Sequence, residues 1–256
     1  MTPTIQDPWT SLRRHTPARI ALGRAGGSLP TAELLDFARA HAAARDAVRS
    51  ELDMEALEQA VRPAGLAVVK LQTHVTDRQS YLLRPDLGRQ LDDASRQALQ
   101  AIQRPGPVDV AIILADGLSA TAAQVQAPAV VKDLVPLLES SRLSLAPLAL
   151  VRFGRVAVQD EIGSLLDARL ALVLLGERPG LGTPDSLGAY LVHAPSAGKT
   201  DADRNCVSNI RPTGLPPAAA ARTLHYLITE SLRKQISGVA LKDERALPHP
   251  ELPANP

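Results

Sequence analysis

The stretch Leu170–His193, LALVLLGERPGLGTPDSLGAYLVH, decides which fold this chain is expected to adopt. Its apolar run ends abruptly in GERPGLG, residues 176–182, where glycine and proline interrupt regular structure. This pattern is typical of a buried strand that ends in a loop at the edge of an α/β sheet. Ligands bind open α/β sheets at the carboxyl ends of their strands. We therefore expect a binding edge here, with Glu177 and Arg178 as its charged side chains.

Strand and helix patterns alternate around this stretch. The segment RPGP at residues 104–107 is the clearest linker. After the linker, strand patterns cover 108–114 and 145–153, and helix patterns cover 122–140, 159–167 and 218–238. Such alternation indicates βαβ units. The predicted fold class is α/β, with a Rossmann-like, mostly parallel sheet flanked by helices, and residues 193–217 are expected to be rich in loops.

The linker also divides the chain into predicted domains. Residues 1–104 carry helical patterns at 30–62 and 91–103, which predict a mainly helical N-terminal domain preceding the sheet. Residues 105–245 are predicted to form the Rossmann-like α/β domain. Residues 246–256 are rich in proline and are predicted to be a disordered tail.

Composition excludes several classes of protein. The 256 residues are 45% hydrophobic and 21% charged, as in an ordinary globular protein. No apolar run reaches the roughly 18–20 residues of a membrane span, and the N-terminus lacks the apolar core of a secretory signal. A net charge of +1 and an aromatic content of 2% argue against nucleic-acid binding. Because Cys206 is the single cysteine and the six histidines are scattered, no internal disulfide and no metal site are expected.

Three segments resemble enzyme motifs but depart from them at decisive positions. Residues 194–200, APSAGKT, end like a phosphate-binding loop, but His193 stands where its first glycine belongs. Residues 184–188, PDSLG, lack the leading glycine of a nucleophile elbow. The spacing in residues 176–182 is G-x-x-x-G-x-G instead of the dinucleotide-binding G-x-G-x-x-G. We therefore expect neither a phosphate-binding loop nor a dinucleotide site, and we expect Ser186 to be an ordinary loop serine.

Three features of the sequence can each be interpreted in two ways. Asp116, followed by a glycine after an expected strand, fits either a turn or a ligand contact. Cys206 lies in the polar segment DRNCVSNIR and fits either a small buried hydrophobe or the lining of a site. Asp160 and Glu161 lie in the first turn of an expected helix, where carboxylates interact favourably with the helix dipole, so a structural role is at least as well supported as a catalytic one.

Six strings occur in a fixed order along the chain and together carry a family resemblance. They are YLLRPDLGR (81–89), DGLS (116–119), VRFGRV (151–156), DEIG (160–163), GERPGLG (176–182) and DRNCVSNI (203–210). In this order they closely resemble the small subunit, or light chain, of ethanolamine ammonia-lyase. The resemblance runs from about Trp9 to Gly238.

The resemblance implies an adenosylcobalamin-dependent lyase that converts ethanolamine to acetaldehyde and ammonia by a radical mechanism. In that family the large subunit carries the substrate site, so no catalytic residue is expected in this chain. The resemblance further implies a hetero-dodecamer of small and large subunits, with the cobalamin at their interface.

Carried over by position, the resemblance implies that Val156, Glu177 and Cys206 contact the cobalamin. Residues 105–245 would then be a cobalamin-binding domain. Arg155 and Arg178 are further candidates for the phosphate of the cofactor or for the partner subunit. The D-x-H-x-x-G signature, which supplies a histidine to cobalt in some cobalamin enzymes, is absent. A base-on cofactor, which keeps its own dimethylbenzimidazole ligand, is therefore expected.

An alternative interpretation comes from a different class of protein. The same patterns fit a stand-alone α/β nucleotide- or cofactor-binding module without lyase activity. Relatives of the small subunit can also carry an N-terminal extension linked to packaging in a bacterial microcompartment. Because the folded pattern of this chain begins almost at Asp7, we expect a cytoplasmic enzyme and leave microcompartment association open.

Overall fold

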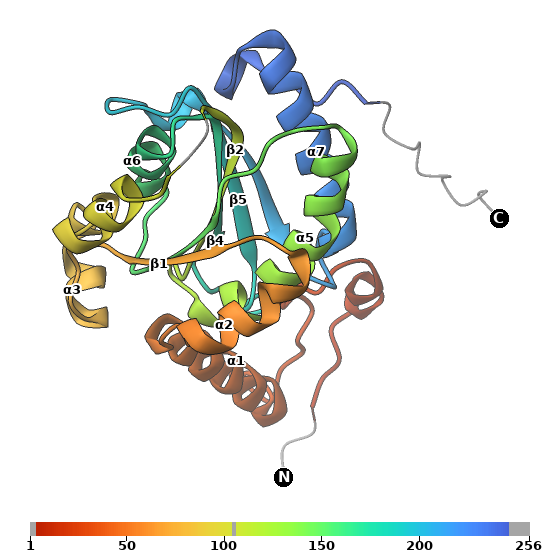
Figure 1. Cartoon of the computed structure of the whole chain (residues 1–256). Coiled ribbons are helices and arrows are strands. Elements are labelled where there is room, and N and C mark those ends of the chain that lie inside the picture. The colour runs from red at the N-terminus through yellow and green to blue at the C-terminus, as the bar shows by residue number, and fades with distance from the viewer. Residues whose placement is uncertain (1–3, 104–105, 246–256) are drawn as a thin grey trace.

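The computed structural model describes residues 4–103 and 106–245. Within these residues, six strands form one sheet in the order β1-β3-β2-β4-β5-β6 (Figure 1). The pairs β1–β3, β3–β2 and β2–β4 are parallel, whereas β4–β5 and β5–β6 are antiparallel. The strands are β1 (Val68–Gln72), β2 (Val108–Ala115), β3 (Leu148–Arg152), β4 (Ala168–Gly176), β5 (Leu187–His193) and β6 (Arg204–Ile210).

Helices cover both faces of the sheet because the central strands are apolar on both faces. On β2, Ile112 and Leu114 pack in the core that contains side chains of α2 (Met54–Val61), α5 (Ala120–Ser140) and α7 (Pro217–Lys234). The alternate residue Ile113 packs in a second core with side chains of α4 (Asp93–Gln100) and α6 (Val158–Leu165). Figure 1 shows α4 and α6 on one side of the sheet and α5 and α7 on the other.

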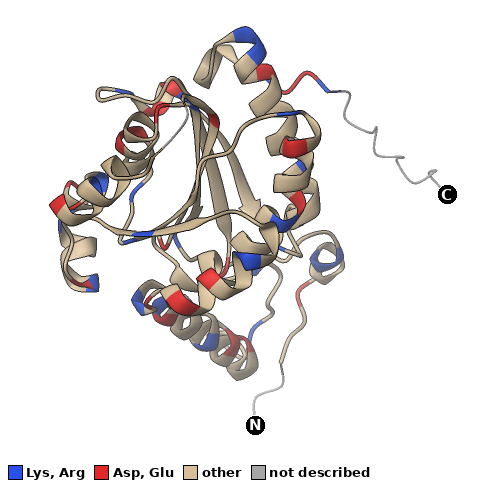
Figure 2. Ribbon diagram, in the orientation of Figure 1, with Lys and Arg blue, Asp and Glu red and all other residues tan. Residues whose placement is uncertain are grey.

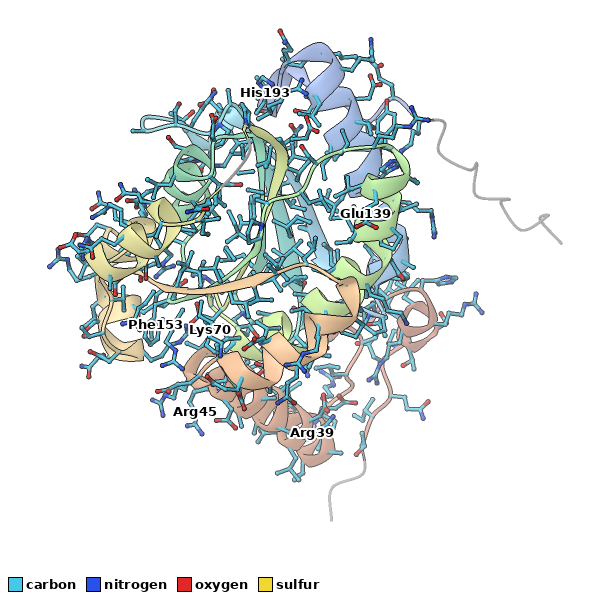
Figure 3. All side chains as sticks on the ribbon, viewed as in Figure 1. Arg39, Arg45, Lys70, Glu139, Phe153 and His193 are labelled. Atoms are coloured by element: carbon cyan, nitrogen blue, oxygen red, sulfur yellow. The ribbon has the colours of Figure 1, made fainter. Side chains whose placement is uncertain are left out.

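The remaining helices lie outside these two layers. Helix α1 (Thr31–Arg49) lies at the periphery (Figure 1), and Ala47 is the one buried residue in it. Its Arg39 and Arg45 project from the molecule (Figure 3). Helix α3 (Arg78–Leu83) lies near the carboxyl ends of the parallel strands. The 3₁₀ helices are η1 (Thr10–His15), η2 (Arg62–Ala64), η3 (Leu87–Arg89), η4 (Asp201–Asp203) and η5 (Gly238–Ala240).

The α/β class is confirmed, and the sheet is mixed, because three of its five strand pairs are parallel and two are antiparallel. The Rossmann-like arrangement stays a prediction. The segment between β4 and β5 carries no helix, and a connection of this length returns the chain antiparallel, since a parallel crossover usually needs a helix. The segment 193–217, expected to be rich in loops, contains β6. Its polar sequence reflects an edge strand, on which Cys206, Ser208 and Asn209 are exposed.

Residues from both sides of the expected linker share this sheet, because β1 precedes the linker and pairs with β3. The division into domains at residue 104 stays a prediction. The predicted disordered tail at 246–256 lies outside the described residues.

Charge is distributed without a dominant sign. In Figure 2, basic and acidic segments alternate along the outer helices, while the strands are largely uncharged. Within the described residues, no helix combines the length and apolar character that crossing a membrane requires.

Candidate functional site at the carboxyl edge of the sheet

A cavity of about 450 Å³ lies where β2, β3 and β4 end. Leu118 follows β2, Val156 follows β3, and Glu177 follows β4, so three consecutive strands of the sheet contribute to one site. This is the edge at which α/β sheets bind ligands. The complete lining is Tyr81, Leu118, Arg155, Val156, Leu175, Gly176, Glu177, Arg178 and Tyr190.

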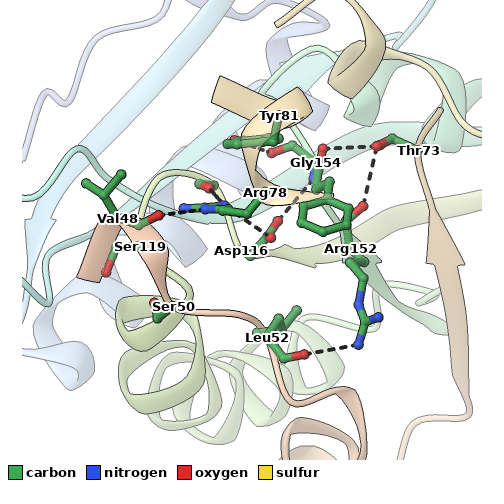
Figure 4. Close-up of polar contacts among 12 residues, drawn as sticks. Val48, Ser50, Leu52, Thr73, Arg78, Tyr81, Asp116, Ser119, Arg152 and Gly154 are labelled. Atoms are coloured by element: carbon green, nitrogen blue, oxygen red, sulfur yellow. Dashed lines mark hydrogen bonds and ion pairs between the residues drawn. The ribbon is translucent and has the colours of Figure 1, made fainter. Parts of the chain in front are cut away.

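The turn that carries Val156 is fixed by three hydrogen bonds to separate elements. The Gly154 amide donates to Asp116 Oδ1 at 3.1 Å, and the Tyr81 hydroxyl donates to the Gly154 carbonyl at 3.0 Å (Figure 4). The Arg155 amide donates to the Gly88 carbonyl at 2.7 Å. Val156 therefore sits on a rigid segment, although it belongs to a loop.

The same turn contains a residue in an unfavourable backbone conformation. Phe153 has a φ of +60°, in the left-handed region that non-glycine residues rarely occupy. Its carbonyl accepts from Thr73 Oγ1 at 3.1 Å, and its ring packs with Val75 and Tyr81 beside α3 (Figure 3). Such a conformation persists only where its surroundings over-determine it. The contacts around Phe153 provide that constraint at the edge of the cavity.

Asp116 is the buried anchor of this turn. It is 0% exposed, and Arg78 Nη1 lies 3.4 Å from its Oδ2 (Figure 4). Burial raises the pKa of Asp116 to about 7, although Arg78 and the Gly154 amide both oppose the rise. Arg78 also donates to the Gly117 carbonyl at 2.8 Å and to the Val48 carbonyl at 2.6 Å. Of its two interpretations, the structure therefore favours a structural role for Asp116 within the turn.

Glu177 folds back over the antiparallel strands. Its Oε2 accepts from Ser186 Oγ at 2.5 Å and from the Asn209 amide at 3.3 Å. Its Oε1 lies against Gly188, where an added Cβ would stand 2.9 Å from that oxygen. The absence of a side chain at Gly188 thus allows the carboxylate to occupy this position. The contacts fix the carboxylate between the cavity and β6.

Cys206 joins the site from β6 through Tyr190. The two residues are antiparallel partners, so their side chains lie on the same face of the sheet. Tyr190 lines the cavity. Although Cys206 is exposed, partial burial of its thiol raises its pKa, the Tyr190 hydroxyl opposes that rise, and the Glu177 carboxylate adds to it. The thiol is therefore protonated at neutral pH, which suits a contact more than a nucleophile.

The structure brings the three sequence-predicted residues together at one edge. Val156 and Glu177 line the cavity directly, and Cys206 extends the same surface. Sequence reasoning missed Tyr81 and Tyr190 as parts of the site. Tyr81 begins the string YLLRPDLGR, which was a signal, whereas Tyr190 sits in an ordinary strand pattern and offered none.

Two arginines contribute positive charge to the lining of the cavity. Arg155 and Arg178 both line it. The Arg155 guanidinium lies 4.0 Å from the centre of the Tyr81 ring, and its Nη2 donates to the Tyr81 carbonyl at 2.7 Å. Its Nε is buried and has no hydrogen-bond partner among the described residues. Across residues 4–103 and 106–245, no cluster of three His, Cys, Asp or Glu residues could hold a metal ion.

Comparison with known proteins identifies the family. A sequence model of the family described as ethanolamine ammonia-lyase light chain (EutC) matches residues 6–242. The chain belongs to this family. The resemblance of the six strings is thereby confirmed.

Individual proteins named as small subunits of this lyase are similar in sequence to this chain over almost its whole length. A protein of Ralstonia nicotianae, named ethanolamine ammonia-lyase small subunit, is 52% identical over 245 residues, which are 95% of this chain and 91% of that protein. A protein of Azotobacter vinelandii with the same name is 52% identical over 244 residues, 94% of this chain and 90% of that protein. One of Pseudomonas syringae pv. tomato, also so named, is 50% identical over 243 residues, 94% of this chain and 85% of that protein.

Proposed function

We propose that this chain is the cobalamin-binding small subunit of an adenosylcobalamin-dependent ethanolamine ammonia-lyase, and that the catalytic residues lie on a large subunit. The observation that carries the proposal is the cavity at the carboxyl edge of the sheet, which Val156 and Glu177 line and which Cys206 extends through Tyr190. Membership of the light-chain family supports it, because the relatives are named small subunits of that lyase.

The chemistry of the cavity fits cobalamin, whose corrin ring is fringed with amides and whose nucleotide loop carries a ribose and a phosphate. The Glu177 carboxylate would accept a hydrogen bond from an amide or a ribose hydroxyl, and the Val156 backbone would bond an amide. Arg155 and Arg178 would face the phosphate. The buried, unpartnered Arg155 Nε is a group that a ligand could satisfy.

The size of the cavity favours a cofactor shared between two chains. About 450 Å³ suits a drug-sized ligand but encloses only part of a cobalamin. The exposed residues Cys206 and Ser208 continue the surface across β6, and no element among the described residues covers them. We propose that a large subunit covers the remainder.

Helix α1 and the segment before it offer a docking surface for that large subunit. Of the twelve exposed large hydrophobic residues in the described part of the chain, seven fall between residues 5 and 37. On α1, Leu34 is 54% exposed and Leu35 is 65% exposed. Exposed apolar residues that gather in one region of a protein are typical of protein interfaces. Helix α1 itself lies close to the glycine-rich loop, because Gly182 of that loop lines a cleft with Glu33 and Asp36 of α1.

When bound, the cofactor would supply the radical chemistry. The residues of this chain bind it, orient it and exclude water. We propose that the cofactor is base-on, because the sequence lacks the D-x-H-x-x-G signature. We assign no catalytic role to any residue of this chain.

The test is ethanolamine-dependent release of acetaldehyde in the presence of adenosylcobalamin. Three samples are compared: this chain alone, a cognate large subunit alone, and the mixture. Activity confined to the mixture is the expected result. A mixture that co-purifies but stays inactive would contradict the proposal and favour a stand-alone nucleotide- or cofactor-binding module.

Assembly and location are part of the same proposal. We propose a hetero-dodecamer in the cytoplasm, which the mass of the purified complex in light scattering and cell fractionation would check. A smaller complex would contradict the stoichiometry. Quantitative recovery with microcompartment shell proteins would contradict the location.

A further inference from the structure

A buried ion pair connects the two elements that carry Val156 and Cys206. Arg204, the first residue of β6, donates through Nη2 to Asp160 Oδ2 in the first turn of α6. The two side chains are only 3% and 9% exposed. Val156 lies two residues before α6 begins, and Cys206 lies two residues after Arg204. Since alternate residues of a strand share a face, Arg204 and Cys206 point to the same side of the sheet.

Helix α6 and strand β6 pack mainly on different elements, so the ion pair between Asp160 and Arg204 is a direct link between them. Helix α6 packs on β2, β4 and α4, whereas β6 pairs with β5 and contacts α7 and η5. The ion pair therefore spans β5 and joins the helix to an edge strand. Edge strands are paired on one side only, so an added tether restricts their movement.

Stability alone does not explain this pair. Asp160 Oδ1 and Arg204 Nε are buried and have no hydrogen-bond partner among the described residues. Burial raises the pKa of Asp160 to about 6, even though Arg204 and Lys199 lower it. A buried ion pair with unsatisfied atoms is often no more stable than apolar side chains of similar volume. The contribution of this ion pair is therefore sought in how it positions β6 relative to α6.

We infer that Asp160 and Arg204 are positioning residues that hold β6 against α6 and thereby set the separation of Cys206 from Val156 across β5. The inference rests on the proposed function, because it assigns both residues to the binding surface for cobalamin. Neither residue needs to touch the cofactor. The Asp160–Glu161 carboxylates thus differ in role, since Glu161 accepts from Arg96 Nε and the Leu91 amide instead.

The test uses the complex of this chain with its large subunit and measures two quantities, the melting temperature and the dissociation constant of cyanocobalamin. The double variant Asp160→Leu/Arg204→Met replaces both charged side chains with apolar ones, at a modest increase in their combined volume. We expect its melting temperature to be unchanged or higher and its affinity for cyanocobalamin to fall about tenfold or more. The conservative variant Asp160→Asn, which keeps an acceptor for Arg204, should retain affinity within about threefold of the unaltered complex.

A control ion pair between the same two residue types lies at the opposite end of the strands. Arg169 Nη1 and Asp109 Oδ1 form an ion pair at 2.7 Å near the starts of β4 and β2. The variant Asp109→Leu/Arg169→Met should leave cyanocobalamin affinity unchanged. If the Asp160 double variant does not fold, Arg204→Lys keeps the charge but loses the planar fork, and it should weaken affinity in the same direction.

The outcomes separate this inference from the proposed function. In the first outcome, the unaltered complex binds cyanocobalamin, and the folded double variant (or Arg204→Lys in its place) binds it equally well. This outcome refutes the inference and leaves the proposed function standing. If the unaltered complex fails to bind cyanocobalamin, the proposed function is refuted and the inference falls with it.

Discussion

At the scale of single residues, Glu177 is the side chain whose position is most directly explained by its neighbours. Ser186 and Asn209 donate to one of its oxygens, and Gly188 leaves room for the other. These contacts hold a carboxylate ready to accept hydrogen bonds from a ligand, with little side-chain entropy left to lose on binding.

Replacing Glu177 should therefore separate binding from turnover. We expect Glu177→Ala to weaken cobalamin affinity about tenfold or more, as for loss of a hydrogen bond to a charged group. Turnover at saturating cofactor should change much less, because the carboxylate is proposed to hold the cofactor and not to react. Glu177→Gln, which keeps an acceptor oxygen, is the matched control. Loss of turnover at unchanged affinity would count against this assignment.

Asp116 predicts a pH dependence of stability. Burial raises the pKa of Asp116 to about 7 in the folded chain, whereas an unfolded aspartate has a pKa of about 3.9. The folded chain then binds the proton more tightly, so the stabilisation from Asp116 is complete below about pH 4 and is lost as the pH rises to about 7.

The measurement is the free energy of unfolding by urea at several pH values between about 4 and 8. The unaltered chain should lose more stability than Asp116→Asn as the pH rises through this range. The difference between the two proteins is the readout, because other carboxylates, such as Glu230 with its pKa lowered to about 2, act in the opposite direction. Parallel curves for the two proteins would show that Asp116 does not titrate in this window.

At the scale of elements, α1 presents apolar residues to solvent where a helix of a monomer would bury them. Its inward residues include Glu33 and Asp36, which pair with Arg13 and Arg19 of the preceding segment. The helix is thus held by ion pairs on one side and leaves Leu34 and Leu35 free on the other.

A charge placed on that apolar face should weaken assembly without unfolding the chain. We expect Leu35→Asp to change the free energy of unfolding by less than about 0.5 kcal/mol, as for an exposed position. Affinity for the large subunit should fall at least about fivefold, the cost of an interface side chain worth about 1 kcal/mol. Val125→Asp on α5, where Val125 is 57% exposed, is the matched control. Equal affinities in a pull-down titration of the two variants would place the interface elsewhere.

The elements also show what the sequence could predict. The strands β2, β3 and β4 have strongly apolar patterns, so they and the binding edge at their carboxyl ends were predictable. Strand β6 was not predictable from the sequence, because it is a half-exposed edge strand whose polar residues resemble those of a loop. The antiparallel course of β5 depends on the connection after β4, which the strand pattern does not specify.

At the scale of the whole molecule, the candidate site joins segments that are distant in the sequence. Tyr81, Asp116 and Gly154 meet in one hydrogen-bonded turn, and no local pattern predicts such a meeting. Sequence pattern marked the loop of Glu177 and the segment of Cys206 as candidates, the resemblance added Val156, and the fold places all three on one surface. Their role as cobalamin contacts stays a prediction.

The most direct test of the central claim is equilibrium binding of cyanocobalamin to this chain alone, to the large subunit alone, and to the mixture. A site shared by two chains predicts tight binding by the mixture and binding at least about a hundredfold weaker by either chain alone, since each then offers only part of the buried surface. Binding by the large subunit alone that is as tight as binding by the mixture would contradict the claim that this chain forms part of the cofactor site.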